Sequence, residues 1–179
     1  MTDRYGPVAM SLHWFGAALV LAGFAAGLYM TGLAFSPAKL RWYGWHKWIG
    51  VTVFLVAAAR LAWRRRVPPP PLPAATPAWQ RRAAHATHGA LYALMLAVPL
   101  SGWLYSSATG VSVVYLSLVP LPNLVAKDKA LADTLLVVHQ SLNATLALLV
   151  VLHVAAALRH QWVDRDGLLF RMLPWRASP

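Results

Sequence analysis

Apolar residues occur in four long blocks that short polar segments separate. The blocks cover about residues 10–33, 45–63, 84–106 and 134–158. Each has about 19–25 residues, which is enough for an α-helix to cross ~30 Å of hydrocarbon. The pattern therefore predicts an all-α fold, an integral membrane four-helix bundle that forms a single domain over residues 1–179.

The composition favours a lipid environment. Hydrophobic residues make up 59% of the 179 residues and charged residues 12%, whereas soluble domains average about 25% charged residues. Cysteine is absent, which excludes disulfides, cysteine-ligated zinc, iron–sulfur clusters and covalently attached haem. The net charge is +11, but the basic residues cluster between the apolar blocks. This distribution is typical of a topology signal, so we expect membrane lipid and no nucleic acid as a partner.

The basic residues divide unequally between the two sides of the predicted bundle. One side has Arg4, Arg60, Arg64, Arg65, Arg66, Arg81, Arg82, Arg159, Arg165, Arg171 and Arg176; the other has Lys39, Arg41, Lys47, Lys127 and Lys129. The positive-inside rule then predicts that both termini and the proline-rich segment 67–71 are cytoplasmic. The loop 108–133 should be outside, lying partly on the membrane surface because residues 111–118 are largely apolar.

Seven histidines carry the candidate chemistry. They are His13 in the first block, His46 at the start of the second, His85 and His88 at the start of the third, His139 and His153 in the fourth, and His160 just beyond it. No Asp or Glu lies within the four blocks. A proton pathway would usually also contain carboxylates, whereas iron ligation needs neutral imidazole, which an apolar interior tolerates. The histidines therefore favour haem.

The histidine spacing predicts two haem sites at different depths. His139 and His153 are 14 residues apart, so they fall on nearly one helix face and about 21 Å apart along its axis. The second and fourth helices both start outside, which places His46 at the level of His139. The first starts inside, which places His13 at the level of His153. We expect His46 and His139 to hold an outer haem, and His13 and His153 an inner one.

Two further residues fit this geometry, each with a structural alternative. Gly27 follows His13 by 14 residues and would give a porphyrin room at the outer haem; with Gly23 it also forms a Gly-x-x-x-Gly motif typical of close helix packing. Arg60 follows His46 by 14 residues and would reach a propionate of the inner haem, or it extends to the interface as many membrane arginines do.

The remaining histidines leave several roles open. His85 and His88 begin the third helix on the inner side, so only the inner haem is within their reach. Three roles are open for these two residues: they contact a quinone, they pair with propionates of the inner haem, or they are residues of the membrane interface without a function in electron transfer. The candidates for quinone contact are His88, Arg81, His160 and Trp162.

Ordered motifs resemble those of the bacterial cytochrome b561 family, in its short four-helix form. They are Tyr5-Gly6-Pro7, Leu12-His13-Trp14, Trp45-His46-Lys47-Trp48-Ile49-Gly50, Arg60-Leu61, His85-Ala86-Thr87-His88, Pro99-Leu100-Ser101-Gly102-Trp103, His139-Gln140-Ser141-Leu142, the run from His153 to His160, and Arg171-Met172-Leu173-Pro174. The resemblance covers nearly the whole chain. One departure is that Gln161 and Trp162 follow His160, where the family often has paired histidines.

The resemblance implies two non-covalent haem b groups in a multi-pass protein of the bacterial inner membrane. The implied iron ligands are His13, His46, His139 and His153, with His85 and His88 as non-ligands. Short members look like superoxide oxidases, which pass electrons from superoxide outside to ubiquinone. Longer relatives are membrane subunits that serve hydrogenases and other dehydrogenases. The alternative is therefore an electron conduit that docks a soluble redox protein, and a transporter or structural protein is the non-redox reading.

Overall fold

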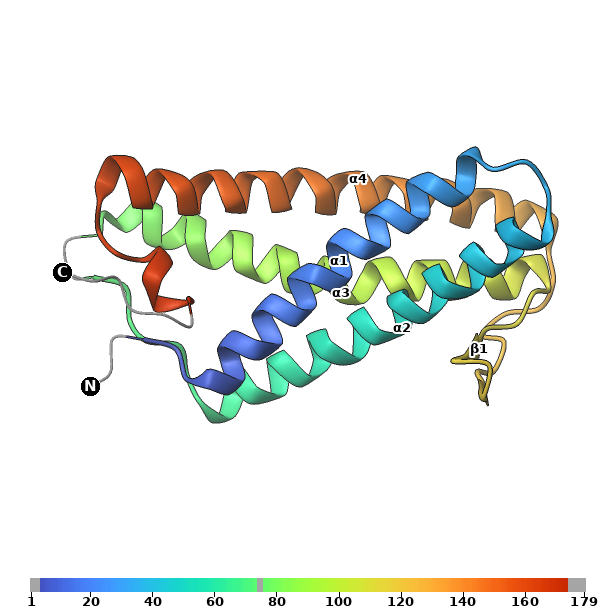
Figure 1. The fold of residues 1–179 in the computed structure, drawn as a ribbon, viewed down its shortest axis with the longest axis horizontal. Helices are drawn as coiled ribbons and strands as arrows, with labels where there is room; N and C mark the ends of the chain where they lie inside the picture. The colour runs from blue at the N-terminus through green and yellow to red at the C-terminus, as the bar shows by residue number, and fades with distance from the viewer. Residues whose placement is uncertain (1–3, 74–75, 174–179) are drawn as a thin grey trace.

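The computed structural model describes residues 4–73 and 76–173. The chain forms α1 (Pro7–Gly32), α2 (Pro37–Arg66), α3 (Ala78–Thr109), β1 (Val114–Tyr115), β2 (Val119–Pro120) and α4 (Lys129–Arg159), then a π-helical turn (His160–Asp164) and a 3-10 turn (Leu169–Arg171). The start of α1, the end of α2, the start of α3 and the turns after α4 lie at one end of an elongated bundle (Figure 1). The predicted four-helix architecture is confirmed, with the correction that a short antiparallel hairpin interrupts the α3–α4 connection.

The helices extend beyond the apolar blocks because capping residues lie outside them. α2 begins at Pro37, where the Ser36 side chain accepts a hydrogen bond from the Lys39 amide at 3.2 Å and proline occupies the first turn. α4 begins at Lys129, after Asp128 accepts a hydrogen bond from the Leu131 amide at 3.0 Å. Both arrangements satisfy backbone groups that a helix start leaves unpaired. The apolar blocks therefore indicate which part of each helix suits lipid, and they do not indicate where the helix begins or ends.

Among the residues that the structure describes, three helices are long and apolar enough to cross a membrane, namely α1, α3 and α4 continued to Asp164. α2 has sufficient length, but basic residues near both of its ends lower its mean hydropathy, and its longest stretch without charge is residues 48–59. That α2 also spans the bilayer stays a prediction, as does the cytoplasmic position of the termini. Two residues counted in the sequence patterns, Pro174 and Arg176, lie outside the described residues.

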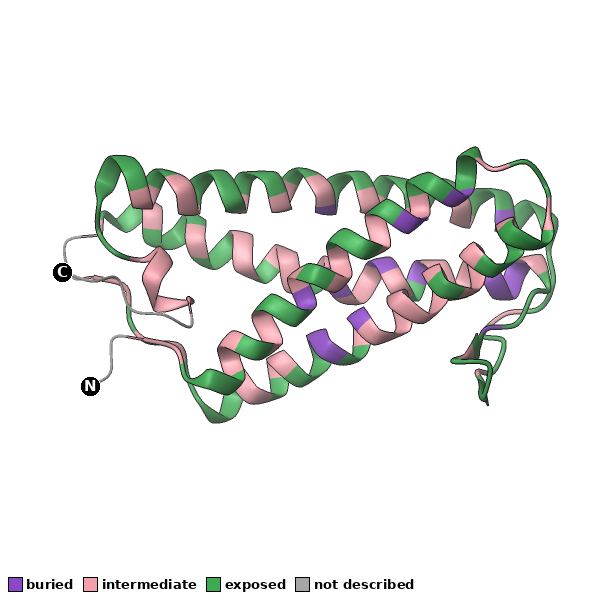
Figure 2. Ribbon diagram, in the orientation of Figure 1, coloured by how far each residue is buried: buried purple, intermediate pink, exposed green. Residues whose placement is uncertain are grey.

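The helices pack as two pairs that share one interface. α1 packs against α2, α3 packs against α4, and α2 joins the pairs by packing against α3. Val53, Ala57 and Met95 form a small cluster of buried residues between α2 and α3, and the other buried apolar side chains of the described residues are spread along the bundle. Large apolar side chains instead face outward along the helices, and exposed positions cover much of the bundle surface (Figure 2). Such an exterior suits lipid, where close packing rather than the hydrophobic effect holds helices together.

The last described residues pack back onto the start of the chain. The Tyr5 amide donates to the Arg171 carbonyl at 3.1 Å, and Trp14 Nε1 donates to the Met172 carbonyl at 2.8 Å. The Arg171 guanidinium donates to the Pro71 carbonyl at 2.9 Å. The C-terminal segment therefore ties the start of α1 to the proline-rich connection at one end of the bundle.

The hairpin is attached to the opposite end. Its turn contains Leu116 and Ser117 with φ of 52° and 59°, the backbone region that tight hairpin turns use. Trp48 Nε1 on α2 donates to the Val114 carbonyl at 2.8 Å. Leu118 at the hairpin is 80% exposed. That this connection rests on the membrane surface stays a prediction.

Candidate functional site

His46 of α2 and His139 of α4 face one another, and their ring centroids are 6.4 Å apart. His46 Nδ1 lies 3.1 Å from the Gly23 carbonyl oxygen of α1, and His139 Nδ1 lies 3.1 Å from the Val98 carbonyl oxygen of α3. A carbonyl only accepts, so each Nδ1 carries the hydrogen and each Nε2 keeps its lone pair. Metal-ligating histidines typically donate their other ring N–H in this way.

Ser101 of α3 reinforces this arrangement. Its hydroxyl donates to the Val98 carbonyl at 2.7 Å and lies 2.9 Å from His139 Nδ1. Because the hydroxyl hydrogen is already used, the Ser101 oxygen accepts from His139, and the Nδ1–H is shared between two acceptors. The side chain of His139 is therefore held by two groups of α3, the helix that supplies no predicted ligand. Sequence reasoning did not identify Ser101.

Two glycines lie against the rings of this pair. A Cβ at Gly27 would come within 3.2 Å of His46 Cε1, and a Cβ at Gly102 within 3.0 Å of His139 Cε1. Contacts this short would force a neighbour to move. Gly27 lies beside His46, and its role at a haem stays a prediction. Gly102 was missed because it is placed by the packing of α3 on α4. We name His46 and His139 the outer pair, and His13 and His153 the inner pair, after their predicted depths.

A cavity formed by all four helices adjoins the outer pair. Its lining includes Leu19, Val20, Gly23, Phe24, His46, Ile49, Gly50, Val53, Met95, Val98, Pro99, His139, Asn143 and Leu146. Metal–imidazole bonds of about 2.0–2.1 Å on opposite sides of one ion would place two ring centroids roughly 6 Å apart. The centroid separation, the free Nε2 atoms and the apolar lining all fit a haem held between these two histidines.

His13 of α1 and His153 of α4 form the second pair, with ring centroids 6.3 Å apart. Arg60 Nη2 lies 3.1 Å from His13 Nδ1. A guanidinium only donates, so His13 Nδ1 accepts here and Nε2 carries the hydrogen. Iron ligation through Nε2 requires the other tautomer, so Arg60 would have to release this nitrogen. The Arg60 guanidinium also lies 5.2 Å from the ring centroid of Tyr92.

His88 of α3 adds a third imidazole to the inner pair. Its ring centroid is 5.3 Å from that of His153, and its side chain is half-buried. His85, one turn earlier, is exposed. Within residues 4–73 and 76–173, His153 has no hydrogen-bond partner for its ring nitrogens. Three imidazoles therefore lie together at the inner site. In the described residues His13 and His153 lack the backbone hydrogen bonds of the outer pair, whereas His88 has one with Ala84.

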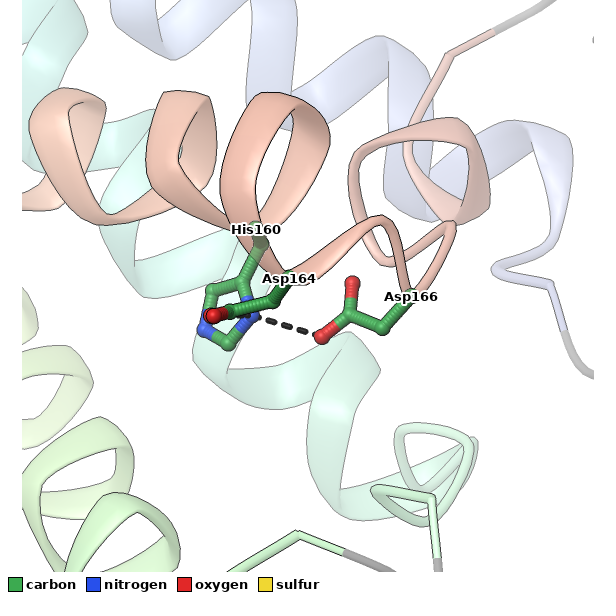
Figure 3. A group of neighbouring side chains, drawn as sticks. All are labelled: His160, Asp164 and Asp166. Carbon is green, nitrogen blue, oxygen red and sulfur yellow. Dashed lines mark hydrogen bonds and ion pairs between the residues drawn. The ribbon is translucent and has the colours of Figure 1, made fainter.

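The four quinone candidates have different surroundings. His88 joins the inner pair, and Arg81 Nε donates to the Thr76 carbonyl at 3.0 Å. His160 faces Asp164 and Asp166 (Figure 3). Trp162 is 67% exposed. It lines a surface cavity together with Gln161, Arg165, Gly167 and Phe170.

Comparison with known families identifies the chain. The family described as prokaryotic cytochrome b561 matches residues 4–175. The chain belongs to the prokaryotic cytochrome b561 family. As a member of this family it is a multi-pass membrane haem protein of the cytochrome b561 type, and the group that the family implies is haem b.

Relatives of this cytochrome match along almost their whole length. "Cytochrome b561 homolog 2" of Escherichia coli strain K12 is 36% identical over 96% of the chain and 92% of the relative. "Cytochrome b561 homolog 1" of the same strain is 28% identical over 97% and 99%. The "Probable superoxide oxidase CybB" of Yersinia pestis is also 28% identical, over 97% and 98%. Of these names, one states an activity.

Proposed function

We propose that this cytochrome b561 binds two haem b groups, one between His46 and His139 and the other between His13 and His153. The observation that carries the proposal is the outer pair, where two backbone carbonyls hold both imidazoles with Nε2 free. The inner pair supports it through its similar 6.3 Å centroid separation. Haem b supplies reversible one-electron chemistry when bound, and two histidine ligands leave iron no open position for a substrate.

We further propose that the cytochrome oxidises superoxide at the hairpin end and reduces ubiquinone at the other. Two superoxide ions would each lose one electron and leave as O₂, and one ubiquinone would gain two electrons and two protons to become the quinol. Support comes from the relative named a probable superoxide oxidase. It also comes from the charge at the hairpin end of the bundle.

Basic side chains exceed acidic ones at that end. Lys39, Arg41, Lys47, Lys127 and Lys129 lie there with Asp128 and Asp133. Lys129 Nζ is paired with Asp133 at 2.7 Å, so its charge is partly offset. The surplus of positive charge attracts a small anion and raises its encounter rate in a salt-dependent way. In this proposal the basic side chains at the hairpin end attract superoxide electrostatically and do not bind the haem iron.

Quinone contact at the opposite end rests on the cavity beside Trp162. Gln161 and Arg165 offer polar groups there, while Trp162 and Phe170 offer aromatic surface. This combination suits a ring with carbonyl oxygens. His160 and His88 remain candidates for supplying protons, and Arg81 for contact with the quinone from the adjoining connection.

The first test is a reduced-minus-oxidised absorbance spectrum of the purified protein with haem counted per chain. We expect two haems, and loss of the same haem from the His46→Ala and His139→Ala variants. The haem-loaded protein should then be reduced by superoxide at low salt and pass electrons to a soluble ubiquinone analogue. A haem-loaded protein that superoxide leaves oxidised would overturn the substrate assignment while leaving the haem proposal intact.

The alternative of an electron conduit makes a different charge prediction. Neutralising Lys39, Arg41, Lys47 and Lys127 one at a time should lower the superoxide rate in small steps, because each contributes to one field. A docking surface for a soluble redox protein would instead lose its partner abruptly, and the isolated chain would show little superoxide oxidation. The dependence of the rate on the number of charges removed separates the two.

A further inference from the structure

Two of the five acidic residues of the chain converge on one histidine beyond the end of α4. Asp166 Oδ2 lies 2.6 Å and Asp164 Oδ2 3.3 Å from the same atom, His160 Nδ1 (Figure 3). In a chain with 16 basic residues and 5 acidic ones, carboxylates have many cationic partners available. Their convergence on a single imidazole nitrogen needs a specific explanation.

The local backbone brings the three side chains together. His160 and Asp164 are the first and last residues of the π-helical turn, and Arg165 then adopts a left-handed conformation with φ of 51°. This reversal returns Asp166 to the imidazole, and the Leu168 amide donates to its other carboxylate oxygen at 3.0 Å. The side chains of His160, Asp164 and Asp166 keep only 24%, 26% and 27% of their accessible area.

A single hydrogen serves this arrangement poorly. Nδ1 of an imidazole carries at most one hydrogen, so two carboxylates have to share it, whereas the two acceptors beside His139 Nδ1 are an uncharged carbonyl and an uncharged hydroxyl. Arg159 Nε lies 3.6 Å from the Asp164 oxygen, but its side chain is 57% exposed, so this ion pair is weak and easily opened. A divalent cation, by contrast, accepts one lone pair from each of the three groups at once.

We propose that His160, Asp164 and Asp166 form a binding site for a divalent transition-metal ion of the zinc class. One ligand atom from each residue lies within 4.8 Å of the others. A tetrahedral zinc ion with bonds of about 2.0–2.2 Å keeps its ligand atoms about 3.3 Å apart. The Asp164–His160 distance already has this value, and Asp166 needs to withdraw by less than about 1 Å.

The ligand chemistry selects the class of metal. One imidazole nitrogen with two carboxylate oxygens suits zinc, whereas magnesium and calcium prefer oxygen ligands alone. Three protein ligands leave a fourth position for water. None of the three residues belongs to either histidine pair, so the site does not depend on the proposed haems. It lies in the same turn as the cavity beside Trp162, so a metal on His160 would compete with the role of that residue as a proton donor to quinone.

The test is direct binding of Zn²⁺ to the haem-loaded, chelator-treated full-length protein. Equilibrium dialysis followed by elemental analysis counts zinc per chain, and haem counted separately shows that the inner histidines are occupied. We expect one zinc per chain, not displaced by excess Mg²⁺. The Asp164→Asn and Asp166→Asn variants should bind zinc at least about tenfold more weakly.

Matched variants guard against general effects. Asp133→Asn removes an exposed carboxylate at the other end of the bundle, and His85→Gln removes an exposed imidazole of α3; both should keep full zinc binding. Unchanged haem spectra will show that Asp164→Asn and Asp166→Asn still fold. Zinc should also raise the Tm of the wild-type protein and not that of these two variants. Absence of stoichiometric zinc in the wild type, or equal binding in the Asp→Asn variants, would overturn the site.

Discussion

The two histidine pairs have nearly the same separation but very different surroundings. The outer rings are held by backbone carbonyls of two further helices, Gly23 of α1 and Val98 of α3. The inner pair has a guanidinium on His13 and a third imidazole, His88, beside His153. Backbone bonds fix both tautomer and orientation before any ligand arrives, whereas side-chain neighbours can rearrange.

The difference indicates how each site would take up haem. The outer site is preorganised, because both Nε2 lone pairs are already free and Gly27 and Gly102 leave room at the rings. The inner site must first break the contact between Arg60 and His13. Preorganisation lowers the cost of binding, so we expect the outer haem to bind more tightly.

The largest effect should come from removing a ligand at each site. His139→Ala should lose the outer haem entirely, because no other imidazole lies beside His46 in the described part of the chain. His13→Ala should retain part of the inner haem, since His88 offers a nearby replacement for the lost ring. The His13→Ala/His88→Ala double variant should lose it. The number of haems per chain, measured by absorbance, tests these expectations. If His139→Ala and His13→Ala retained equal amounts of haem, the proposed difference between the two sites would be wrong.

A smaller effect is expected from filling the space beside His139. Gly102→Ala places a Cβ 3.0 Å from the imidazole, and we expect it to destabilise the outer site by about 1–3 kcal/mol. Gly89→Ala on the same helix is the matched control, because a Cβ there meets nothing within 4 Å. Haem retention during thermal unfolding distinguishes them. If Gly102→Ala and Gly89→Ala lost haem at the same temperature, the His139 ring would be free to move away from the added Cβ.

Loss of the Ser101 hydroxyl should be milder still. Ser101→Ala removes one of the two acceptors of the His139 Nδ1 hydrogen and leaves the Val98 carbonyl. We expect outer haem binding about tenfold weaker, with the inner haem unaffected. Ser141→Ala, at an exposed position of α4, serves as the control. Haem titration into the haem-free protein gives both affinities, and an effect on the inner haem alone would contradict the assignment.

The smallest effect concerns Arg60. Replacing Arg60 with Gln removes a positive charge beside the inner histidines. The loss of this charge disfavours the reduced haem. The inner midpoint potential should fall by less than about 59 mV, the one-electron equivalent of a tenfold change. The outer potential should stay constant, and Arg65→Gln, at an exposed position nearby, should change neither. A redox titration followed by absorbance measures all three.

The sequence predicted the helices and the histidine pairs because both follow from one-dimensional regularities. Apolar blocks locate the helices, and the 14-residue spacing places His139 and His153 on one face of α4. Ser101 and Gly102 were not predicted, because their contact with His139 depends on how α3 crosses α4. The start of α2 was not predicted, because Ser36 and Pro37, whose residue types are typical of a helix start, lie before its apolar block.

The carboxylate cluster shows a second kind of omission. His160 was considered as a quinone contact. Asp164 follows it by four residues, the spacing of an ordinary helical pair, and this signal was not used. Asp166 follows His160 by six residues and would lie on another face of a continued helix, and the left-handed Arg165 brings it back to the imidazole. Irregular backbone of this kind depends on tertiary contacts, which periodicity does not encode.

One consequence concerns the order of assembly during synthesis. α4 carries one histidine of each pair. The carbonyl groups of Arg171 and Met172, after α4, accept hydrogen bonds from Tyr5 and Trp14. These groups follow α1, α2 and α3 in the chain, so neither pair is complete, and the start of α1 is not secured, until α4 and the segment after it have been synthesised. In the proposed ligation, a chain truncated before α4 would capture no haem by the paired histidines, so haem retention would report that synthesis has passed α4.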